Sequence, residues 1–254
     1  MKNRVLVANW KLYVRAHRAE ALAKVYAARF GEQRFRSVTQ ILCPSFPEIE
    51  DVAHAAKKSA LLLGAQDVGL VPAGPATGAI SIRDLRDLGC RFVILGHSER
   101  RALGETDAVI ANKLLLVAAW GLTPILCVGE TRAVRRQRKE QQVVERQLRR
   151  ALRRFRGKQL CICYEPVWAI SASGKSSGAC SPVLANAMRR IIEHTLLGIF
   201  RHRRITVRLL YGGSVSGKNI AAYVGPEGFH GALVGFASTK TAEYATMVRA
   251  IARR

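Results

Sequence analysis

Acidic residues are scarce in this sequence. Only 18 Asp and Glu stand against 41 Lys and Arg, which gives a formal net charge of +23. A protein with this charge attracts anions in general, such as nucleic acid, acidic lipid or phosphorylated metabolites. The charge alone does not distinguish between these classes of partner.

The sequence also lacks long apolar segments, a recognisable signal peptide and a linker between domains. The longest uninterrupted apolar runs, such as Leu114–Trp120, are far shorter than a membrane span. The basic and then apolar N-terminus leads into Asn-Trp-Lys rather than a small-residue cleavage site, so we do not expect a signal peptide. No Pro/Gly/Ser-rich linker divides the chain, and 49% of its residues are hydrophobic. We therefore expect one packed domain over residues 1–254.

The six cysteines lack the spacings typical of metal sites. None belongs to a CxxC pair or to a Cys/His pattern. Cys161 and Cys163 alternate along an expected strand, so they share a face and are not expected to bond to each other. We expect all six to be reduced small hydrophobes in a cytoplasmic protein, and we expect no bound metal.

Short apolar runs alternate with longer segments of helical period along the whole chain. The runs predict eight strands: Arg4–Ala8, Thr39–Cys43, Ala60–Ala65, Phe92–Leu95, Pro124–Val128, Leu160–Tyr164, Val207–Leu210 and Ala232–Val234. The segments between them predict helices near 16–30, 45–57, 80–88, 105–120, 131–155, 181–197, 216–224 and 240–252.

The expected strands are apolar almost throughout, which is typical of parallel strands covered on both faces. Eight β/α units in about 250 residues predict a single-domain (β/α)8 barrel, in which helices surround eight parallel strands. An open doubly wound sheet is the alternative, but no GxGxxG motif opens its first helix.

Functional sites in such a barrel lie where the strands end, at their C-terminal edge. Polar residues follow six of the expected strands: Asn9 and Lys11; Gln66 and Asp67; His97, Ser98 and Glu99; Gly129 and Glu130; Glu165; and Gly212, Gly213 and Ser214. Taken singly, His97 could be a structural histidine and Glu165 an ion-pair partner. Their common position at one edge of the barrel favours a shared site.

These residue types suit one kind of chemistry. A carboxylate at a strand end can act as a general base, and nearby His and Lys side chains can polarise a carbonyl and stabilise an oxyanion. The Gly-rich turn YGGSVSGKN at 211–219 can offer N–H groups to a phosphate. The set suits proton transfer next to a carbonyl in a small phosphorylated substrate, without a cofactor or a metal.

Seven segments resemble the triosephosphate isomerase family, in order and across essentially the whole chain: NWK at 9–11, ILGHSERR at 94–101, LGETD at 103–107, GLTPILCVGET at 121–131, YEPVWAI at 164–170, YGGSV at 211–215 and GALVGFAS at 231–238. The resemblance implies interconversion of dihydroxyacetone phosphate and D-glyceraldehyde 3-phosphate through an enediol(ate). By the family's known mechanism, Glu165 would be the base and His97 the neutral electrophile, while Lys11 would face the substrate's negative charge and Asn9 would assist at the oxygen.

The resemblance also implies supporting roles. Glu99 would orient Lys11 or Ser98, and Thr77 would reach the site of a second subunit in a homodimer. The phosphate would lie against Ser171, Gly212, Gly213, Ser214, Gly235 and Phe236. A lid would close over it, formed by Pro166, Val167, Trp168, Ala169, Ile170, Ser171, Ala172, Ser173, Gly174, Lys175, Ser176 and Ser177.

The chain departs from the family pattern at three places. The lid tip is one residue longer and lacks its first glycine. Phe236 replaces the second of two glycines after the last strand, which would strain a backbone with positive φ. Ala76 and Ala79 replace an aromatic and a Glu in the interface loop GPATGAIS, so Arg100 would lose an acidic partner across the interface and the homodimer would be weakened.

The basic segment 132–158 has an apolar face made of Val144, Leu148, Ala151, Leu152 and Phe155, with arginines around it. A solvated outer helix of the barrel is one interpretation, and a surface for a phosphate backbone is the other. We expect at most non-specific binding of nucleic acid, because no aromatic row is interleaved with the arginines. Two alternative functions stay open: an isomerase of a related ketose phosphate, and a basic nucleic-acid-binding barrel with a decayed site.

Overall fold

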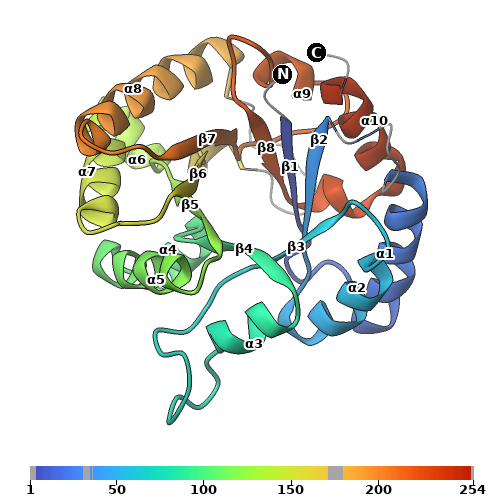
Figure 1. Ribbon diagram of the computed structural model, residues 1–254. Coiled ribbons are helices and arrows are strands. Elements are labelled where there is room, and N and C mark those ends of the chain that lie inside the picture. The colour runs from blue at the N-terminus through green and yellow to red at the C-terminus, as the bar shows by residue number, and fades with distance from the viewer. Residues whose placement is uncertain (1–3, 31–34, 36, 171–179, 253–254) are drawn as a thin grey trace.

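A computed structural model describes residues 4–30, 35, 37–170 and 180–252. Eight parallel strands close into a barrel in sequence order, and β1 pairs with β8 (Figure 1). The strands are β1 (Arg4–Asn9), β2 (Val38–Cys43), β3 (Leu62–Ala65), β4 (Cys90–Leu95), β5 (Thr123–Val128), β6 (Gln159–Tyr164), β7 (Thr206–Tyr211) and β8 (Gly231–Val234). The predicted barrel and its eight strands are confirmed, and the β1–β8 pairing excludes an open sheet.

Helices form a ring outside the strands (Figure 1). They are α1 (Ala16–Phe30), α2 (Ile49–Ala56), α3 (Ile82–Asp87), α4 (Ser98–Ala102), α5 (Asp107–Ala119), α6 (Arg132–Arg136), α7 (Glu140–Leu152), α8 (Pro182–Phe200), α9 (Ile220–Tyr223) and α10 (Thr241–Ala252), with the short 3-10 helices η2 (Phe46–Glu48), η3 (Val167–Ala169) and η4 (Phe236–Thr239). Among the described residues, no helix is both long enough and apolar enough to cross a membrane.

The prediction of one helix over 131–155 is wrong. The chain leaves the helical conformation between α6 and α7, where Arg138 adopts a φ of 54°. The Arg138 N–H donates to the Arg135 carbonyl and the Lys139 N–H to the Val134 carbonyl, so α6 ends in a left-handed cap. Such caps favour glycine. Because an arginine occupies this position, the sequence carries no signal for the end of α6.

The core has two layers. Alternate strand residues fill the barrel interior: Val5, Val7, Ile41, Cys43, Ile94, Ile125, Cys127, Cys161, Cys163, Leu210 and Leu233. A larger cluster packs the outer faces of the strands against the helices. Gly231 is needed where the barrel closes, because a Cβ there would lie 1.9 Å from the Val5 carbonyl oxygen.

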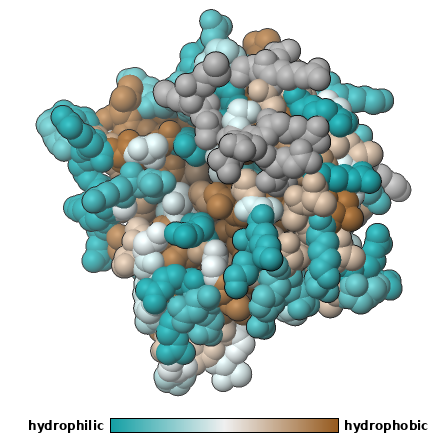
Figure 2. Space-filling model, turned by 45° about the vertical axis from the view of Figure 1, so that its right-hand side comes forward, coloured by the Kyte–Doolittle hydropathy of each residue, from teal (hydrophilic) through white to brown (hydrophobic). Residues whose placement is uncertain are grey.

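Hydrophilic side chains cover most of the face shown in Figure 2, and hydrophobic side chains appear between them as small separate patches. Large exposed hydrophobic side chains do occur, such as Leu12 and Leu103. Scattered exposure of this kind is normal for a folded domain and does not by itself indicate an interface.

Candidate active site

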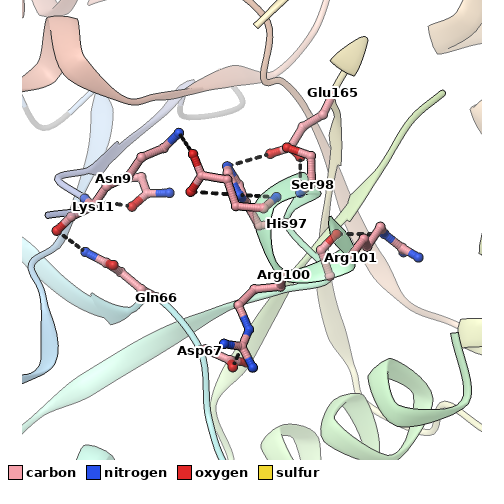
Figure 3. A network of polar contacts seen from close by, with 11 residues as sticks. Asn9, Lys11, Gln66, Asp67, His97, Ser98, Arg100, Arg101 and Glu165 are labelled. Atoms are coloured by element: carbon pink, nitrogen blue, oxygen red, sulfur yellow. Dashed lines mark hydrogen bonds and ion pairs between the residues drawn. The ribbon is translucent and has the colours of Figure 1, made fainter. Parts of the chain in front are cut away.

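Asn9, His97 and Glu165 meet at the C-terminal edge of the barrel (Figure 3). Asn9 ends β1, while His97 and Glu165 follow β4 and β6. All three are buried, with 4%, 5% and 2% of their surface exposed. The strand ends therefore bring together polar side chains from three distant parts of the sequence, as predicted from their positions.

Glu165 is held by two neighbours from the segment after β4. The Ser98 backbone N–H donates to Glu165 Oε2 over 3.0 Å, and His97 Nε2 lies 3.4 Å from Glu165 Oε1. On the other side of the His97 ring, the Glu99 N–H donates to Nδ1 over 3.3 Å. Since Nδ1 accepts this hydrogen bond, the imidazole proton belongs on Nε2. The ring thus directs an N–H donor to the side on which Glu165 lies.

Lys11 is held in an unusual conformation. Its φ is 47°, a left-handed value that costs about 1–3 kcal/mol for a residue other than glycine. The Asn9 side-chain oxygen accepts a hydrogen bond from the Lys11 N–H, and the Gln66 amide donates to the Lys11 carbonyl. The Lys11 ammonium lies 2.6 Å from Glu99 Oε1. These contacts fix a cation at the edge of the site, and the role expected of Glu99 in orienting Lys11 stays a prediction.

A pocket of about 370 Å³ opens beside these residues. It is lined by residues from the strand ends and the loops that follow them: Lys11, His97, Ile170, Gly212, Gly213, Ser214, Val215, Ser216, Asn219, Leu233, Val234, Gly235, Phe236, Ala237, Lys240 and Glu243. Among the described residues, the backbone N–H groups of Gly213 and Gly235 have no acceptor. Two free N–H donors and two lysines suit an anionic group.

Phe236 does not strain the backbone. Among the described residues, only Lys11 and Arg138 combine a side chain with positive φ, so the strain considered for Phe236 is absent. Its ring packs edge-on against Tyr13, with ring centroids 5.2 Å apart, and the Lys240 ammonium lies 5.0 Å from the ring centre. The ring therefore leans on the loop after β1 at the border of the pocket.

The first part of the expected lid, Pro166–Ile170, is described and contains η3. Ser214 donates both its backbone N–H and its hydroxyl to the Ala169 carbonyl, over 3.1 and 2.7 Å. The buried Glu130 carboxylate accepts from the Trp168 indole and the Tyr164 hydroxyl. The remaining expected lid residues, 171–177, lie outside the described residues, and so does the expected phosphate ligand Ser171.

Thr77 lies apart from this site. It is exposed in the loop between β3 and α3, which extends away from the barrel (Figure 1). Arg100 was expected to lack an acidic partner, and this expectation is wrong: its Nε lies 3.0 Å from Asp67 Oδ2 within the same chain. Asp67 also binds Lys113, which in turn binds Glu105. These four residues form a compact ion cluster beneath the loop.

Gln66 and Glu130 were predicted to follow strands, but their positions in the sequence indicated no role for either. Gln66 bridges the carbonyls of Lys11 and Cys43 through its amide, so it ties the loop after β1 to β2. Glu130 binds the Trp168 indole, at the start of the expected lid. Their position after a strand was the available signal, but it does not reveal which backbone group a side chain will bind.

Comparisons with known proteins agree with this geometry. The family model described as Triosephosphate isomerase matches residues 4–251. The chain belongs to the triosephosphate isomerase family. It is 39% identical to triosephosphate isomerase of Roseiflexus castenholzii over 252 residues, which cover 98% of this chain and 97% of the relative. It is 38% identical over 252 residues to triosephosphate isomerase of Moorella thermoacetica and 39% identical over 256 residues to that of Rhodopirellula baltica, each with 98% of both chains covered.

Membership of the triosephosphate isomerase family over nearly the full length agrees with the closed barrel. Two of the three departures from the family pattern fall on described residues. Phe236 is accommodated without a positive φ, and Ala76 and Ala79 lie in the extended loop between β3 and α3. The third departure, in the lid tip, lies outside the described residues.

Proposed function

We propose that this protein interconverts dihydroxyacetone phosphate and D-glyceraldehyde 3-phosphate. Glu165 would take a proton from the hydroxyl-bearing carbon beside the carbonyl, while the Nε2–H of His97 donates to the carbonyl oxygen. In the enediol(ate), His97 would give this proton to the former carbonyl oxygen and take up the hydroxyl proton from the neighbouring oxygen. Glu165 would then return its proton to the former carbonyl carbon and become ionised again. The observation that carries the proposal is the pairing of a buried Glu165 with His97 Nε2 at 3.4 Å.

Lys11 and the free N–H groups would bind the charged end of the substrate. The Lys11 ammonium can face the phosphate or the developing oxyanion, and Glu99 would keep it in place through their 2.6 Å contact. The N–H groups of Gly213 and Gly235 supply donors for phosphate oxygens. Gly213 must lack a side chain here, because a Cβ would lie 2.3 Å from the Tyr211 hydroxyl.

A coupled assay tests the proposal directly. Purified protein given dihydroxyacetone phosphate should form glyceraldehyde 3-phosphate, which a dehydrogenase and its nicotinamide cofactor report by absorbance. A rate no higher than that of the buffer would refute the proposed reaction. Turnover of a longer ketose phosphate in preference to the triose would favour the related isomerase instead.

Replacement of Phe236 by glycine should change KM for dihydroxyacetone phosphate by less than about three-fold. The ring rests on Tyr13 and Lys240, so it need not occupy the space of the phosphate, and the backbone N–H is unchanged. The measurement is KM for the triose and for a longer ketose phosphate. A large gain on the triose alone would mean that the ring obstructs the phosphate, whereas a triose gain with a matching loss on the longer sugar would favour the alternative isomerase.

We also propose a homodimer built on the loop between β3 and α3, with Thr77 reaching the partner's site. The loop is exposed at Thr77 and extends from the barrel, which supports a role in contacts between subunits (Figure 1). The ion cluster of Asp67, Arg100, Glu105 and Lys113 braces its base. Arg100 has its acidic partner within the same chain, so the absence of a Glu at position 79 leaves no unpaired cation.

This dimer should dissociate on dilution more readily than an interface with an aromatic anchor. Ala76 offers little side-chain area, and the loss of an aromatic anchor costs about 2 kcal/mol or more at the centre of an interface. Sedimentation velocity over a dilution series should show the dimer giving way to the monomer. A dimer that persists below about 1 nM would contradict the expectation.

We propose that binding of nucleic acid is at most non-specific and that the protein acts in the cytoplasm without a membrane partner. The outward face of α7 carries Arg146, Arg149 and Arg150, all of which are exposed. Such a face attracts a phosphate backbone whatever its sequence. Six buried, unpaired cysteines support a reducing compartment.

A further inference from the structure

Two thiols face each other inside the barrel beneath Glu165. Cys127 and Cys163 are paired in register on the neighbouring strands β5 and β6, and both belong to the interior cluster. Glu165 follows β6 two residues after Cys163. The two sulfur atoms and a Glu165 carboxylate oxygen all lie within 4.8 Å of one another. Cysteines without CxxC spacing are therefore brought together by strand register.

We propose that Cys127, Cys163 and Glu165 form a site for a thiophilic divalent cation of the zinc class, and that a cation bound there withdraws Glu165 from catalysis. The withdrawal of Glu165 from catalysis rests on the proposed function. The binding of a cation by these three residues does not depend on it.

The donor set fits such a cation. Thiolates select zinc-like ions over magnesium or calcium, which prefer oxygen ligands alone. In a tetrahedral site with Zn–S bonds of about 2.3 Å, the ligand atoms lie about 3.5–3.8 Å apart. Atoms that are all within 4.8 Å need to move inward by about an ångström at most. Three protein ligands leave the fourth position to water, as in open zinc sites.

The Glu165 carboxylate is available to a cation. Its Oε2 accepts from the Ser98 N–H, but its buried Oε1 has no hydrogen-bond partner among the described residues. His97 Nε2 lies 3.4 Å from this oxygen, which is longer than a normal hydrogen bond, so a bound cation would compensate its desolvation more fully. Glu165 is 2% exposed, so the site would be largely shielded from water.

Binding of a cation to the two thiols releases two protons. Both thiols, those of Cys127 and Cys163, are buried, and a thiol in apolar surroundings carries its proton when no cation is bound. The cation must displace two protons, which leave to solvent as two metal–sulfur bonds form. Nothing is oxidised or reduced. The product is an ion held by two thiolates and one carboxylate, with Glu165 unable to accept a proton from substrate.

Cys161 provides a matched control. It lies on the same strand and the same face as Cys163, one layer deeper, and belongs to the same interior cluster. Among the described residues, the group with metal-ligand geometry contains Cys163 but not Cys161. Replacement of either cysteine by alanine removes one buried thiol from β6, and only one of the two replacements removes a proposed ligand.

Titration of the full chain with Cd²⁺, a spectroscopic probe of zinc-type thiolate sites, separates the outcomes. The wild type should develop a thiolate-to-cadmium charge-transfer band that saturates at one ion per chain, and Zn²⁺ should compete for it. Cys161→Ala should keep the band. Cys163→Ala should lose it, with affinity falling by more than the roughly 10–100-fold that loss of an outer contact costs. If Cys163→Ala fails to fold, Cys163→Ser keeps the volume and replaces a soft ligand by a weak one.

The absorbance does not depend on turnover, so it tests the metal site even if the proposed reaction is wrong. No saturable band in the wild type, an unchanged band in Cys163→Ala, or equal loss in both alanine variants would overturn the site. Inhibition of isomerisation by Cd²⁺ in the wild type and in Cys161→Ala, but not in Cys163→Ala, supports the withdrawal of Glu165. A saturated band with unchanged isomerase activity would overturn that second half.

Discussion

Replacement of Glu165 by glutamine should lower kcat by roughly a thousand-fold or more, because positioned general bases contribute about 10²–10⁴ in rate and an amide cannot take up the proton. The fold should be unaffected. Glutamine has nearly the same shape, and its side-chain oxygen can still accept from the Ser98 N–H that now binds Glu165 Oε2. The measurements are kcat in the coupled assay and the midpoint of urea unfolding.

Glu145→Gln is the matched control for this substitution. Glu145 lies on the outer helix α7 and contacts Gln141, so the loss of its charge should leave kcat unchanged. A Glu165→Gln variant that keeps most of the wild-type kcat would show that another group takes the proton. Loss of activity together with loss of the unfolding transition would instead indicate a structural effect, and Glu165→Asp would then test the position of the carboxylate.

Replacement of Lys113 by methionine should lower the free energy of unfolding by about 3–5 kcal/mol. The Lys113 ammonium lies 2.7 Å from Asp67 and also binds Glu105, and its side chain is only 6% exposed. Without it, two largely buried carboxylates remain close together, and burial already raises the pKa of Asp67. Arg100 still contacts Asp67, so we expect the lower end of the range. Urea unfolding at neutral pH measures the change.

Lys24→Met provides the comparison for an exposed ion pair. Lys24 pairs with Glu20 on α1 and is 63% exposed, so its replacement should cost less than about 1 kcal/mol. If Lys113→Met and Lys24→Met lowered the free energy of unfolding by similar amounts, the ion cluster would not behave as a buried one. If the proposed dimer forms through the loop between β3 and α3, Lys113→Met should also shift its equilibrium towards monomer.

The strands and the central pair of the site were predictable from the sequence for a physical reason. A strand buried on both faces must be apolar along its length, and a polar residue directly after it marks the barrel edge. His97 and Glu165 were found by this rule. The contacts of side chains with distant backbone were not predictable, because no local pattern reveals that Gln66 reaches the Lys11 carbonyl.

Two errors have identifiable causes. The break between α6 and α7 depends on Arg138, a residue type that is common inside helices and rare in left-handed caps. The ion pairs of Arg100 depend on Asp67, which lies 33 positions earlier and comes close only because β3 and β4 are neighbours. The first depends on the conformation of a single residue and the second on a tertiary contact, and helical periodicity and strand-end position are insensitive to both.

The hydrogen bonds of Ser214 affect how a substrate phosphate would bind to the substrate-free protein. Its N–H and hydroxyl are already satisfied by the Ala169 carbonyl. A phosphate that binds Ser214 must therefore replace the Ala169 carbonyl as the acceptor of these hydrogen bonds. Its gain in binding free energy is the difference between the two sets of hydrogen bonds, not the full free energy of the new set. The displaced carbonyl belongs to the segment that leads into the lid. If a phosphate binds Ser214 as proposed, its binding and the release of the Ala169 carbonyl are parts of one exchange, in which the protein's own backbone acts as the competing ligand.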